Sequence, residues 1–177
     1  VAATPRDTLV VAWAIDDIIT MDPAESFEIS AGEIMGNTYD RLVRFDVSDP
    51  SRLYGDIAKA WTVSPDGKLY TFKLRQGVKF HDGTPFNAEA VKWNMDRWRD
   101  PENEWRFGRT FEYYDIEFGT DLAIEEVNVV DEYTVELKLS APSGVLLAKL
   151  AEWFVFGMNS PAAVQEQWEG RIITGDN

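Results

Sequence analysis

The sequence lacks cysteine altogether, holds one histidine and carries few basic residues for its length. Without cysteine there can be no disulfide, no thiolate-bound zinc and no thiol catalysis. Against 31 acidic residues there are only 17 lysines and arginines, so the net charge is −14. A field of that sign repels phosphate backbones and anionic membrane surfaces, which argues against a nucleic-acid partner. The longest apolar run, residues 9–15, is far shorter than the roughly 20 residues that cross a bilayer, so we expect no membrane insertion.

What is present is the composition of a folded, aromatic-rich protein. Apolar residues make up 45% of the 177 and aromatic residues 13%, which is too many for a disordered chain. A chain of this length buries about 70% of its unfolded surface, enough for a real core. Its length corresponds to one domain, or one and a part.

The amino-terminal part predicts one strand and one helix. Residues 9–15 form a continuous apolar run without alternation, which is typical of a strand buried on both faces. After a turn at Asp22, Ser30 and Glu33 have the spacing of a capping box. This spacing predicts a helix over residues 31–41.

The rest of the chain predicts antiparallel hairpins interrupted by helices. Residues 61–63 and 68–75 flank a Pro-Asp-Gly turn, and the second run alternates apolar and polar side chains as half-buried strands do. Asn87 is a capping residue ahead of a helix over residues 88–99. The pattern then predicts a hairpin of residues 124–130 and 133–139, a short helix that ends near residue 151, a strand at 153–158 and a helix that begins at Pro161.

This order predicts an α+β fold rather than regular βαβ alternation. A strand buried on both faces needs neighbours in a sheet, and the sequence supplies few candidates for that role. We therefore expect the chain to be a fragment of a larger protein.

Three carboxylates, Asp16, Asp17 and Asp22, follow the first predicted strand. Ligands of open α/β sheets bind beyond the carboxyl ends of strands, so these side chains are candidate ligand contacts. The alternative is that they solvate a loop and form its turns. Paired carboxylates also serve glycoside hydrolases, but that chemistry needs a fixed separation that a sequence does not give.

His81 and Asp82 together suggest two members of a catalytic triad. Adjacent residues in a Gly-Thr-Pro turn seldom orient one another in that way, and no serine has the setting of a nucleophile elbow.

Residues 110–137 hold nine acidic side chains and no basic one but lack the EF-hand spacing, which favours a solvated surface over a calcium site. We therefore expect no catalytic residue, no metal site and no cofactor.

Aromatic side chains are dense in residues 98–114, where Trp105 lies in a polar loop after Pro101. Such rings either line a pocket for apolar and cationic groups or complete the core. Phe154, in the last predicted strand, has the same two interpretations.

The most distinctive pattern of the chain lies in residues 56–91. It reads Asp56-Ile57-Ala58-Lys59-Ala60-Trp61-Thr62-Val63-Ser64-Pro65-Asp66-Gly67 and continues with Gly77-Val78-Lys79-Phe80-His81-Asp82-Gly83-Thr84-Pro85-Phe86. This pattern resembles the family 5 extracellular solute-binding proteins, the peptide- and nickel-type receptors of ABC importers. The resemblance extends upstream to residues 9–13 and 39–43 and downstream to 127–139, so it touches nearly the whole chain.

The resemblance implies part of a periplasmic-binding-protein-like lobe of type II, cluster C. Residues 1–42 would be the first segment of domain I. Residues 43–168 would be a small inserted domain II of antiparallel hairpins and helices, and residues 169–177 the start of the return to domain I. Family members are commonly about three times as long, so the rest of domain I and all of domain III would be absent, as expected for a fragment.

The function that the resemblance implies is capture of a small ligand, an oligopeptide or dipeptide, and its delivery to an ABC permease in the inner membrane. A nickel chelate, haem or an oligosaccharide is the alternative ligand. The start at Val1 without an initiator Met and the absence of the cysteine that begins lipid-anchored members favour a soluble periplasmic receptor. Since no acid, base and nucleophile are brought together, we expect a receptor and not an enzyme. The alternative classes are a carboxylate-based hydrolase, which would show turnover, and an adhesive module, which no ligand would stabilise.

Six residues are predicted to contact the ligand in an interdomain cleft. They are Ile15, Asp16 and Asp17 after the first strand, Phe27, Trp105 in its polar loop, and Phe154. Phe154 is included because the resemblance places it on a strand that faces the cleft.

Overall fold

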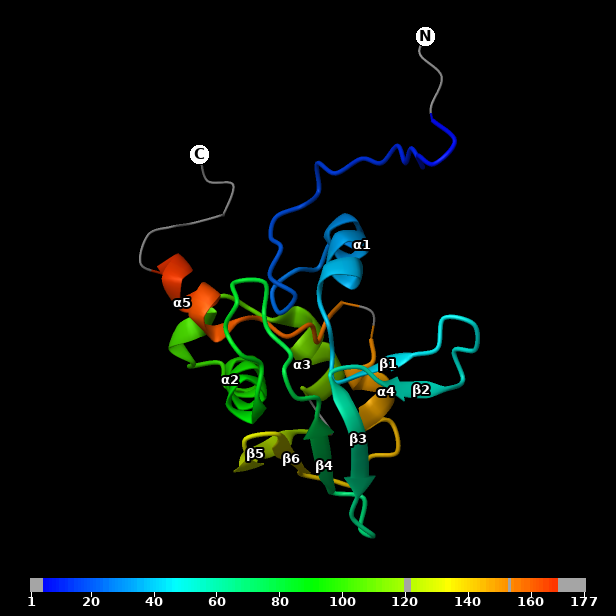
Figure 1. The fold of residues 1–177 in the computed structure, drawn as a ribbon. Coiled ribbons are helices and arrows are strands. Elements are labelled where there is room, and N and C mark those ends of the chain that lie inside the picture. The colour runs from blue at the N-terminus through cyan, green and yellow to red at the C-terminus, as the bar shows by residue number, and fades with distance from the viewer. Residues whose placement is uncertain (1–4, 120–121, 153, 169–177) are drawn as a thin grey trace.

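A four-stranded antiparallel sheet forms the base of the molecule in the computed structural model, which describes residues 5–119, 122–152 and 154–168 (Figure 1). Its spatial order is β3 (Ala58–Val63), β4 (Leu69–Leu74), β6 (Thr134–Leu139) and β5 (Ile124–Asp131). The two predicted hairpins, β3–β4 and β5–β6, are confirmed. They join through β4 and β6, where Phe72 lies opposite Val135.

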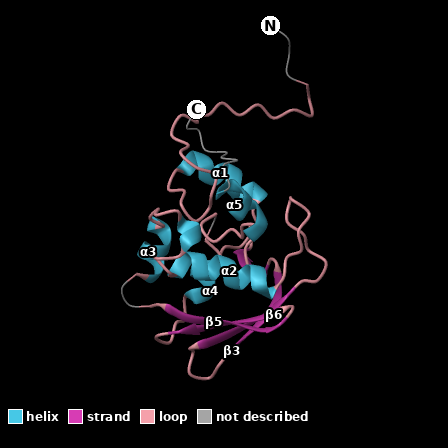
Figure 2. Cartoon of the chain, turned by 90° about the vertical axis from the view of Figure 1, so that its left-hand side faces the viewer, coloured by secondary structure: helices cyan, strands magenta, loops and turns pink. Residues whose placement is uncertain are grey.

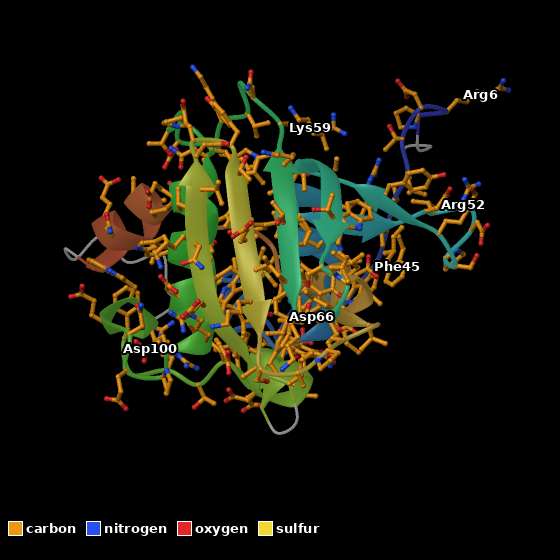
Figure 3. The ribbon with its side chains drawn as sticks, turned by 90° about the horizontal axis from the view of Figure 1, so that it is seen from below. Arg6, Phe45, Arg52, Lys59, Asp66 and Asp100 are labelled. Carbon is orange, nitrogen blue, oxygen red and sulfur yellow. The ribbon has the colours of Figure 1, made fainter. Side chains whose placement is uncertain are left out.

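One face of this sheet is buried beneath helices and the other faces solvent. Alternate residues of the two central strands are buried, as the period of two predicts: Tyr70, Phe72, Leu74, Val135, Leu137 and Leu139. Figure 3 shows the outer face, which no helix covers. Polar pairs cross the strands there, and Thr71 Oγ1 donates to Glu136 Oε1 at 3.0 Å.

The helix α2 (Ala88–Arg99) lies over the buried face, with α4 (Leu146–Leu150) beside it (Figure 2). It has the predicted bounds, because Asn87 Oδ1 accepts a hydrogen bond from the backbone N–H of Ala90 at 3.0 Å. Its predicted stripe of Ala88, Val91, Met95 and Trp98 is buried. These side chains and the inner face of the sheet belong to one core, which residues of α1 (Ile29–Thr38), α3 (Glu112–Phe118), α4 and the chain between α4 and α5 (Pro161–Trp168) complete.

The remaining elements surround this core. The helix α1 (Ile29–Thr38) and the helix α5 (Pro161–Trp168) lie on the side of α2 away from the sheet (Figure 2). A short helical turn, η1 (Glu104–Arg106), and the helix α3 (Glu112–Phe118) follow α2. The strands β1 (Val43–Phe45) and β2 (Leu53–Gly55) form a hairpin that projects from the body (Figure 1). The sequence predicted the start of α5 but none of η1, α3, β1 and β2.

The prediction of a buried strand at residues 9–15 was wrong. This run forms no strand and is exposed, with Leu9 at 86% and Trp13 at 49%. A strand needs backbone partners, and none of the described residues pairs with this run. Its side-chain contact with the body is a hydrogen bond from Trp13 Nε1 to Ser30 Oγ at 3.1 Å.

The predicted capping box was also wrong. The helix α1 begins at Ile29, so Ser30 lies inside it, and its hydroxyl donates to the carbonyl oxygen of Ala14 at 3.1 Å. The N-cap residue is Glu28, whose side chain makes no capping hydrogen bond. A contact between distant segments therefore uses the hydroxyl that the local pattern assigned to the cap.

The strand predicted at 153–158 is absent from its described part. Residue 153 lies outside the described residues, and 154–156 form a turn in which Gly157 N–H donates to the carbonyl oxygen of Phe154 at 3.0 Å. Residues 154–160 are all buried. An apolar run of this length is compatible with any buried conformation, and here it is a buried connection between α4 and α5.

Candidate ligand-binding site

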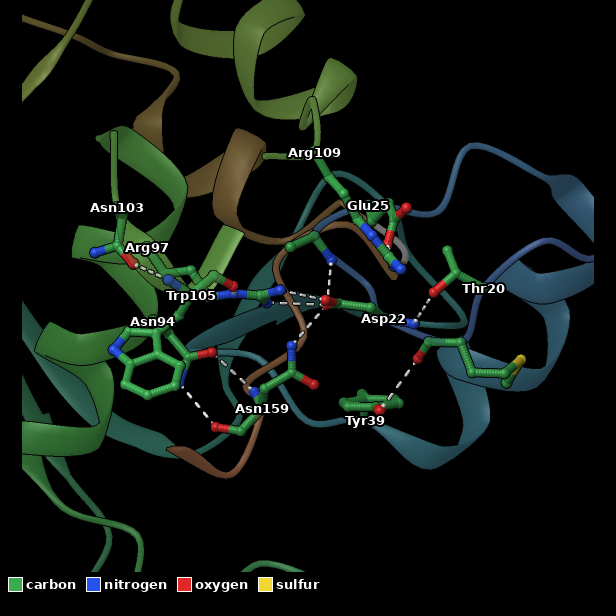
Figure 4. Close-up of polar contacts among 12 residues, drawn as sticks. Thr20, Asp22, Glu25, Tyr39, Asn94, Arg97, Asn103, Trp105, Arg109 and Asn159 are labelled. Carbon is green, nitrogen blue, oxygen red and sulfur yellow. Dashed lines mark hydrogen bonds and ion pairs between the residues drawn. The ribbon is translucent and has the colours of Figure 1, made fainter. Parts of the chain in front are cut away.

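Asp22 is the centre of a polar network that ties the amino-terminal segment to the body (Figure 4). Its carboxylate accepts from both terminal nitrogens of Arg97 on α2, at 3.1 Å from Nη1 to Oδ1 and 2.5 Å from Nη2 to Oδ2. Asn159 Nδ2 donates to Oδ1 at 2.8 Å, and the backbone N–H of Ala24 donates at 3.1 Å. Two parallel hydrogen bonds of this kind fix the orientation of the two side chains in addition to the electrostatic attraction between them.

The Arg97 pair keeps the Asp22 carboxylate ionised. Burial acts to raise the pKa of Asp22, but the charge of Arg97 and the donated hydrogen bonds outweigh it and hold that pKa below its ordinary value. The Arg97 side chain is 1% exposed, so loss of either partner would leave a charge in a poorly solvated place. The pair therefore holds the Asp22 turn against α2.

Two asparagines extend this network to the chain between α4 and α5. Asn94 Nδ2 donates to the carbonyl oxygen of Asn159, and Asn159 N–H donates to Asn94 Oδ1, both at 2.9 Å. On the other side, the Tyr39 hydroxyl donates to the carbonyl oxygen of Met21 at 3.2 Å. Segments from both ends of the described chain are thereby joined on α2.

A cavity of about 490 Å³ lies beside the network. Pockets for small ligands are commonly about 300–1,000 Å³, so this one has room for a small molecule. Its apolar lining includes Met21, Ile57, Val78, Phe80, Phe86, Phe107 and Met158. Its charged or polar lining includes Asp22, Tyr39, Asp40, Lys79, His81, Asp82, Arg109, Asn159 and Ser160.

The carboxylates of this cavity differ in what they already bind. Asp82 accepts from the backbone N–H of Thr84 at 2.8 Å and from the Ser160 hydroxyl; burial acts to raise its pKa, but these hydrogen bonds lower it. Asp40 has no side-chain hydrogen bond to any described residue. Burial and then repulsion by Asp56 raise the pKa of Asp40. Asp40 is thus available to a ligand, whereas Asp82 is occupied.

The loop after α2 carries Phe107 and Arg109 to the cavity. The turn η1 begins at Asn103, whose Oδ1 accepts from the backbone N–H of Trp105 at 3.0 Å. It ends at Phe107, which has a left-handed backbone with φ +55°, and Gly108 follows with φ +74°. A bulky residue in this region is strained and persists only where its surroundings hold it.

The six predicted contact residues fall into three groups. Ile15, Asp16 and Asp17 are exposed on the segment that leaves the body, and they do not line the cavity. Trp105 is half-buried, with ring centroids 6.4 Å from Trp93 and 6.3 Å from Phe107, and it does not line the cavity.

Phe27 and Phe154 are brought together through a third ring, that of Tyr113. The Phe27 and Tyr113 centroids are 4.7 Å apart, and the Tyr113 and Phe154 centroids are 5.7 Å apart in an edge-on arrangement. Phe27 is 49% exposed, whereas Phe154 is 3% exposed and lies so close to Gly32 that a Cβ there would collide with its ring. Contact with a ligand stays a prediction for all six residues.

Sequence reasoning missed Tyr39, Arg109 and Asn159, and it gave Asp22 no partner. A usable signal was present in α2. Asn94 and Arg97 lie three residues apart beside Val91 and Trp98, on the face predicted to be buried. Buried polar side chains need hydrogen-bond partners, so these two indicated a polar contact within the core.

Two features are absent from the described residues. No group of three or more histidine, cysteine, aspartate or glutamate side chains is arranged to hold a metal ion. No described helix combines the length and the apolar character needed to cross a membrane.

Comparison with known proteins gives consistent matches. The glutathione-binding protein GsiB of Escherichia coli K12 is 32% identical over 165 residues, which cover 93% of this chain and 29% of GsiB. The dipeptide-binding protein of Pseudoalteromonas sp. SM9913, solved with Met-Leu, has a TM-score of 0.75 and 26% identity over 85% of this chain and 31% of its own. The periplasmic binding protein DppA of Helicobacter pylori, solved with the peptide STSA, has a TM-score of 0.74 and 26% identity over 85% and 30%.

The chain therefore spans less than a third of the length of these proteins. The likeness confirms a periplasmic-binding-protein fold of mixed helices and antiparallel strands. The family of bacterial extracellular solute-binding proteins, family 5 middle, matches residues 52–173, which contain the whole of the distinctive pattern at residues 56–91. With more than half of its residues in that match, the chain belongs to the family 5 bacterial extracellular solute-binding proteins.

Proposed function

We propose that this chain is part of the substrate-binding component of an ABC importer. In this role it captures a short peptide outside the cytoplasm and passes it to a permease in the membrane. The family match over residues 52–173 is the observation that carries the proposal. The extracellular family and the periplasmic Helicobacter pylori neighbour, which is associated with an ABC transporter, support a periplasmic location and a permease partner.

A peptide is the favoured ligand class. The three proteins compared above bind glutathione, the dipeptide Met-Leu and the peptide STSA, all of which are peptides. The cavity also suits a zwitterion with apolar side chains, because Asp40 and Arg109 line it together with several apolar residues. A nickel chelate, haem or an oligosaccharide is the alternative.

We infer the following division of the chain within a type II, cluster C receptor. Residues 1–42 belong to domain I and residues 43–168 to the inserted domain II. The strand order supports this division, since neither α1 nor the described part of the amino-terminal segment contributes a strand to the sheet. The proposed return to domain I, residues 169–177, lies outside the described residues.

The proposed ligand site combines the cavity with the predicted contacts. Phe27 offers an exposed ring, and the exposed Ile15, Asp16 and Asp17 are accessible to a ligand. Trp105 and Phe154 stay predicted contacts on the same proposal, although both also support the surrounding structure.

Binding without turnover is the proposed activity. Ser160 and His81 line the same cavity, but the Ser160 hydroxyl donates to Asp82, whose carboxylate has a lowered pKa. A carboxylate of low pKa is a weak base for activating a serine. This arrangement favours a receptor over a hydrolase.

The test is to purify the protein at its native length without added ligand and to identify, by mass spectrometry, the small molecules released on denaturation. We expect short peptides, and we expect titrated Met-Leu to be bound and recovered intact. Release of a nickel chelate, haem or an oligosaccharide would contradict the peptide ligand. Cleavage of Met-Leu would contradict the receptor.

A further inference from the structure

We propose that the side-chain oxygen of Asn159 accepts a hydrogen bond from a peptide N–H of the captured ligand. This assignment rests on the proposed peptide-binding function, and it adds to it a residue that recognises the peptide bond itself. Asn159 lies in the chain between α4 and α5, and both its backbone and its side chain belong to the network around Asp22 (Figure 4).

The first argument is that Asn159 presents a hydrogen-bond acceptor with no donor. Asn159 is 6% exposed, and it lines the cavity beside the Asp22 network. Its Nδ2 donates to Asp22, whereas none of the described residues donates to its Oδ1. Buried polar atoms are almost always hydrogen-bonded. An acceptor of this kind in a cavity wall therefore indicates a donor that enters the cavity with the ligand.

The second argument is that the orientation of the Asn159 amide is fixed. The pairing with Arg97 keeps the Asp22 carboxylate ionised, so its oxygens only accept hydrogen bonds. The amide must therefore turn its Nδ2 toward Asp22, at 2.8 Å, and its oxygen the other way. Figure 4 shows this oxygen turned away from Asp22. A flipped amide would place two acceptors against each other, so the oxygen stays on the ligand side.

The third argument is that the backbone around Asn159 is held before any ligand arrives. Asn94 binds both the N–H and the carbonyl oxygen of Asn159, each at 2.9 Å. The next residue, Ser160, accepts from the backbone N–H of Ala163 at 3.2 Å at the start of α5, and its hydroxyl donates to Asp82. Asp82 belongs to the distinctive sequence pattern, so this contact attaches the pattern to the chain beside Asn159. An acceptor held in this way loses little conformational entropy on binding.

The fourth argument concerns the kind of donor that fits. The amide oxygen of Asn159 is uncharged, and Arg97 balances the charge of the neighbouring Asp22 carboxylate. A charged amino group gains more from an ionised acceptor than from a neutral one. The peptide N–H is a neutral donor, and Met-Leu contains a single one, which makes this dipeptide a suitable probe.

The test compares Met-Leu with its depsipeptide, in which an ester oxygen replaces the peptide N–H, by calorimetric titration of the protein at its native length. We expect the wild type to bind the depsipeptide at least about fivefold more weakly, because the donor is lost and two acceptors then face each other. Asn159→Leu has nearly the same shape but no acceptor, and it should bind the two probes with affinities within about twofold of each other. A purely structural effect of Asn159→Leu would weaken both probes equally and keep the wild-type ratio.

The matched control is Asn128→Leu, the same substitution at an exposed position of β5, which should keep both affinities and their ratio. If Asn159→Leu does not fold, Asn159→Ser takes its place, since a serine hydroxyl is still able to donate toward Asp22. The assignment is overturned if the wild type binds both probes equally well, or if the Asn159 variant keeps the wild-type ratio. In either case Met-Leu is bound and the receptor stands. If the wild type does not bind Met-Leu, the peptide ligand and the Asn159 contact fall together.

Discussion

Arg97 and Asp22, 75 positions apart in the chain, form a two-point ion pair in which the guanidinium is almost wholly buried. This pair joins the amino-terminal segment to the helix that covers the sheet. It also fixes the wall of the cavity next to the loop that carries Arg109.

Replacing one partner of the Arg97–Asp22 ion pair should destabilise the folded protein. We expect Asp22→Asn or Arg97→Met to lower the free energy of unfolding by about 3–5 kcal/mol, because each leaves a buried group without its partner. The double variant should lose less than the sum of the two. Urea unfolding of the four proteins measures the coupling, and strictly additive losses would show that the two side chains act independently.

The same pair predicts a loss of stability in acid. The folded-state pKa of Asp22 lies below its ordinary value of 3.8, so its contribution is complete above about pH 4 and is lost as the pH falls through the lower folded-state value. We expect the melting temperature of Asp22→Asn to vary less between pH 6 and pH 3 than that of the wild type. Asp17→Asn, which changes an exposed carboxylate, is the control and should keep the wild-type profile. Parallel profiles for all three proteins would refute the prediction.

A β-branched side chain at Gly67, in the β3–β4 turn, should destabilise the protein. Gly67 has φ +70°, and a Cβ there would approach Pro142 to 3.3 Å. We expect Gly67→Val to cost about 1 kcal/mol or more, since a β-branched residue is strained at positive φ. Gly144→Val is the control, because Gly144 has open space around it and no positive φ. Equal melting temperatures for the two variants would mean that the turn tolerates the strain.

Truncation of Phe154 and truncation of Trp105 should have different effects, because the two rings are buried to different extents. Phe154→Ala should lower the free energy of unfolding by about 3–5 kcal/mol, because its ring is 3% exposed and packs on α1. Trp105→Ala should cost less, because its ring is half-buried, and should weaken the binding of Met-Leu. Melting temperature and calorimetry on the native-length protein distinguish the effects. An unchanged affinity in Trp105→Ala would remove that residue from the site.

Local chemistry explains what the sequence predicted well. The bounds of α2 follow from the Asn87 side chain, and the β3–β4 turn from Pro65 and Gly67, all within a few residues of the feature they determine. The family pattern lies in the same stretch, because its turns and strands are set by neighbouring residues.

The features that the sequence predicted poorly depend on contacts between residues far apart in the chain. Residues 9–15 are apolar enough for a buried strand, but strand formation depends on partners elsewhere. Ser30 has the right spacing for a cap, but Trp13 and Ala14 use its hydroxyl. Arg109 reaches the cavity only because the loop turns at Phe107 and Gly108, and no pattern in the sequence indicates a left-handed phenylalanine.

The exposure of residues 9–15 has a consequence for how the protein opens. Amide hydrogens in β4 and β6 lie between other strands, so they exchange with solvent only when the sheet itself unfolds. The amino-terminal run has no strand partner among the described residues, and Ser30 holds it to the body through hydrogen bonds with Trp13 and Ala14, so its amides exchange from the native state. A protease would therefore cut this run at a rate set by its own local opening and leave the sheet and α2 as a resistant product.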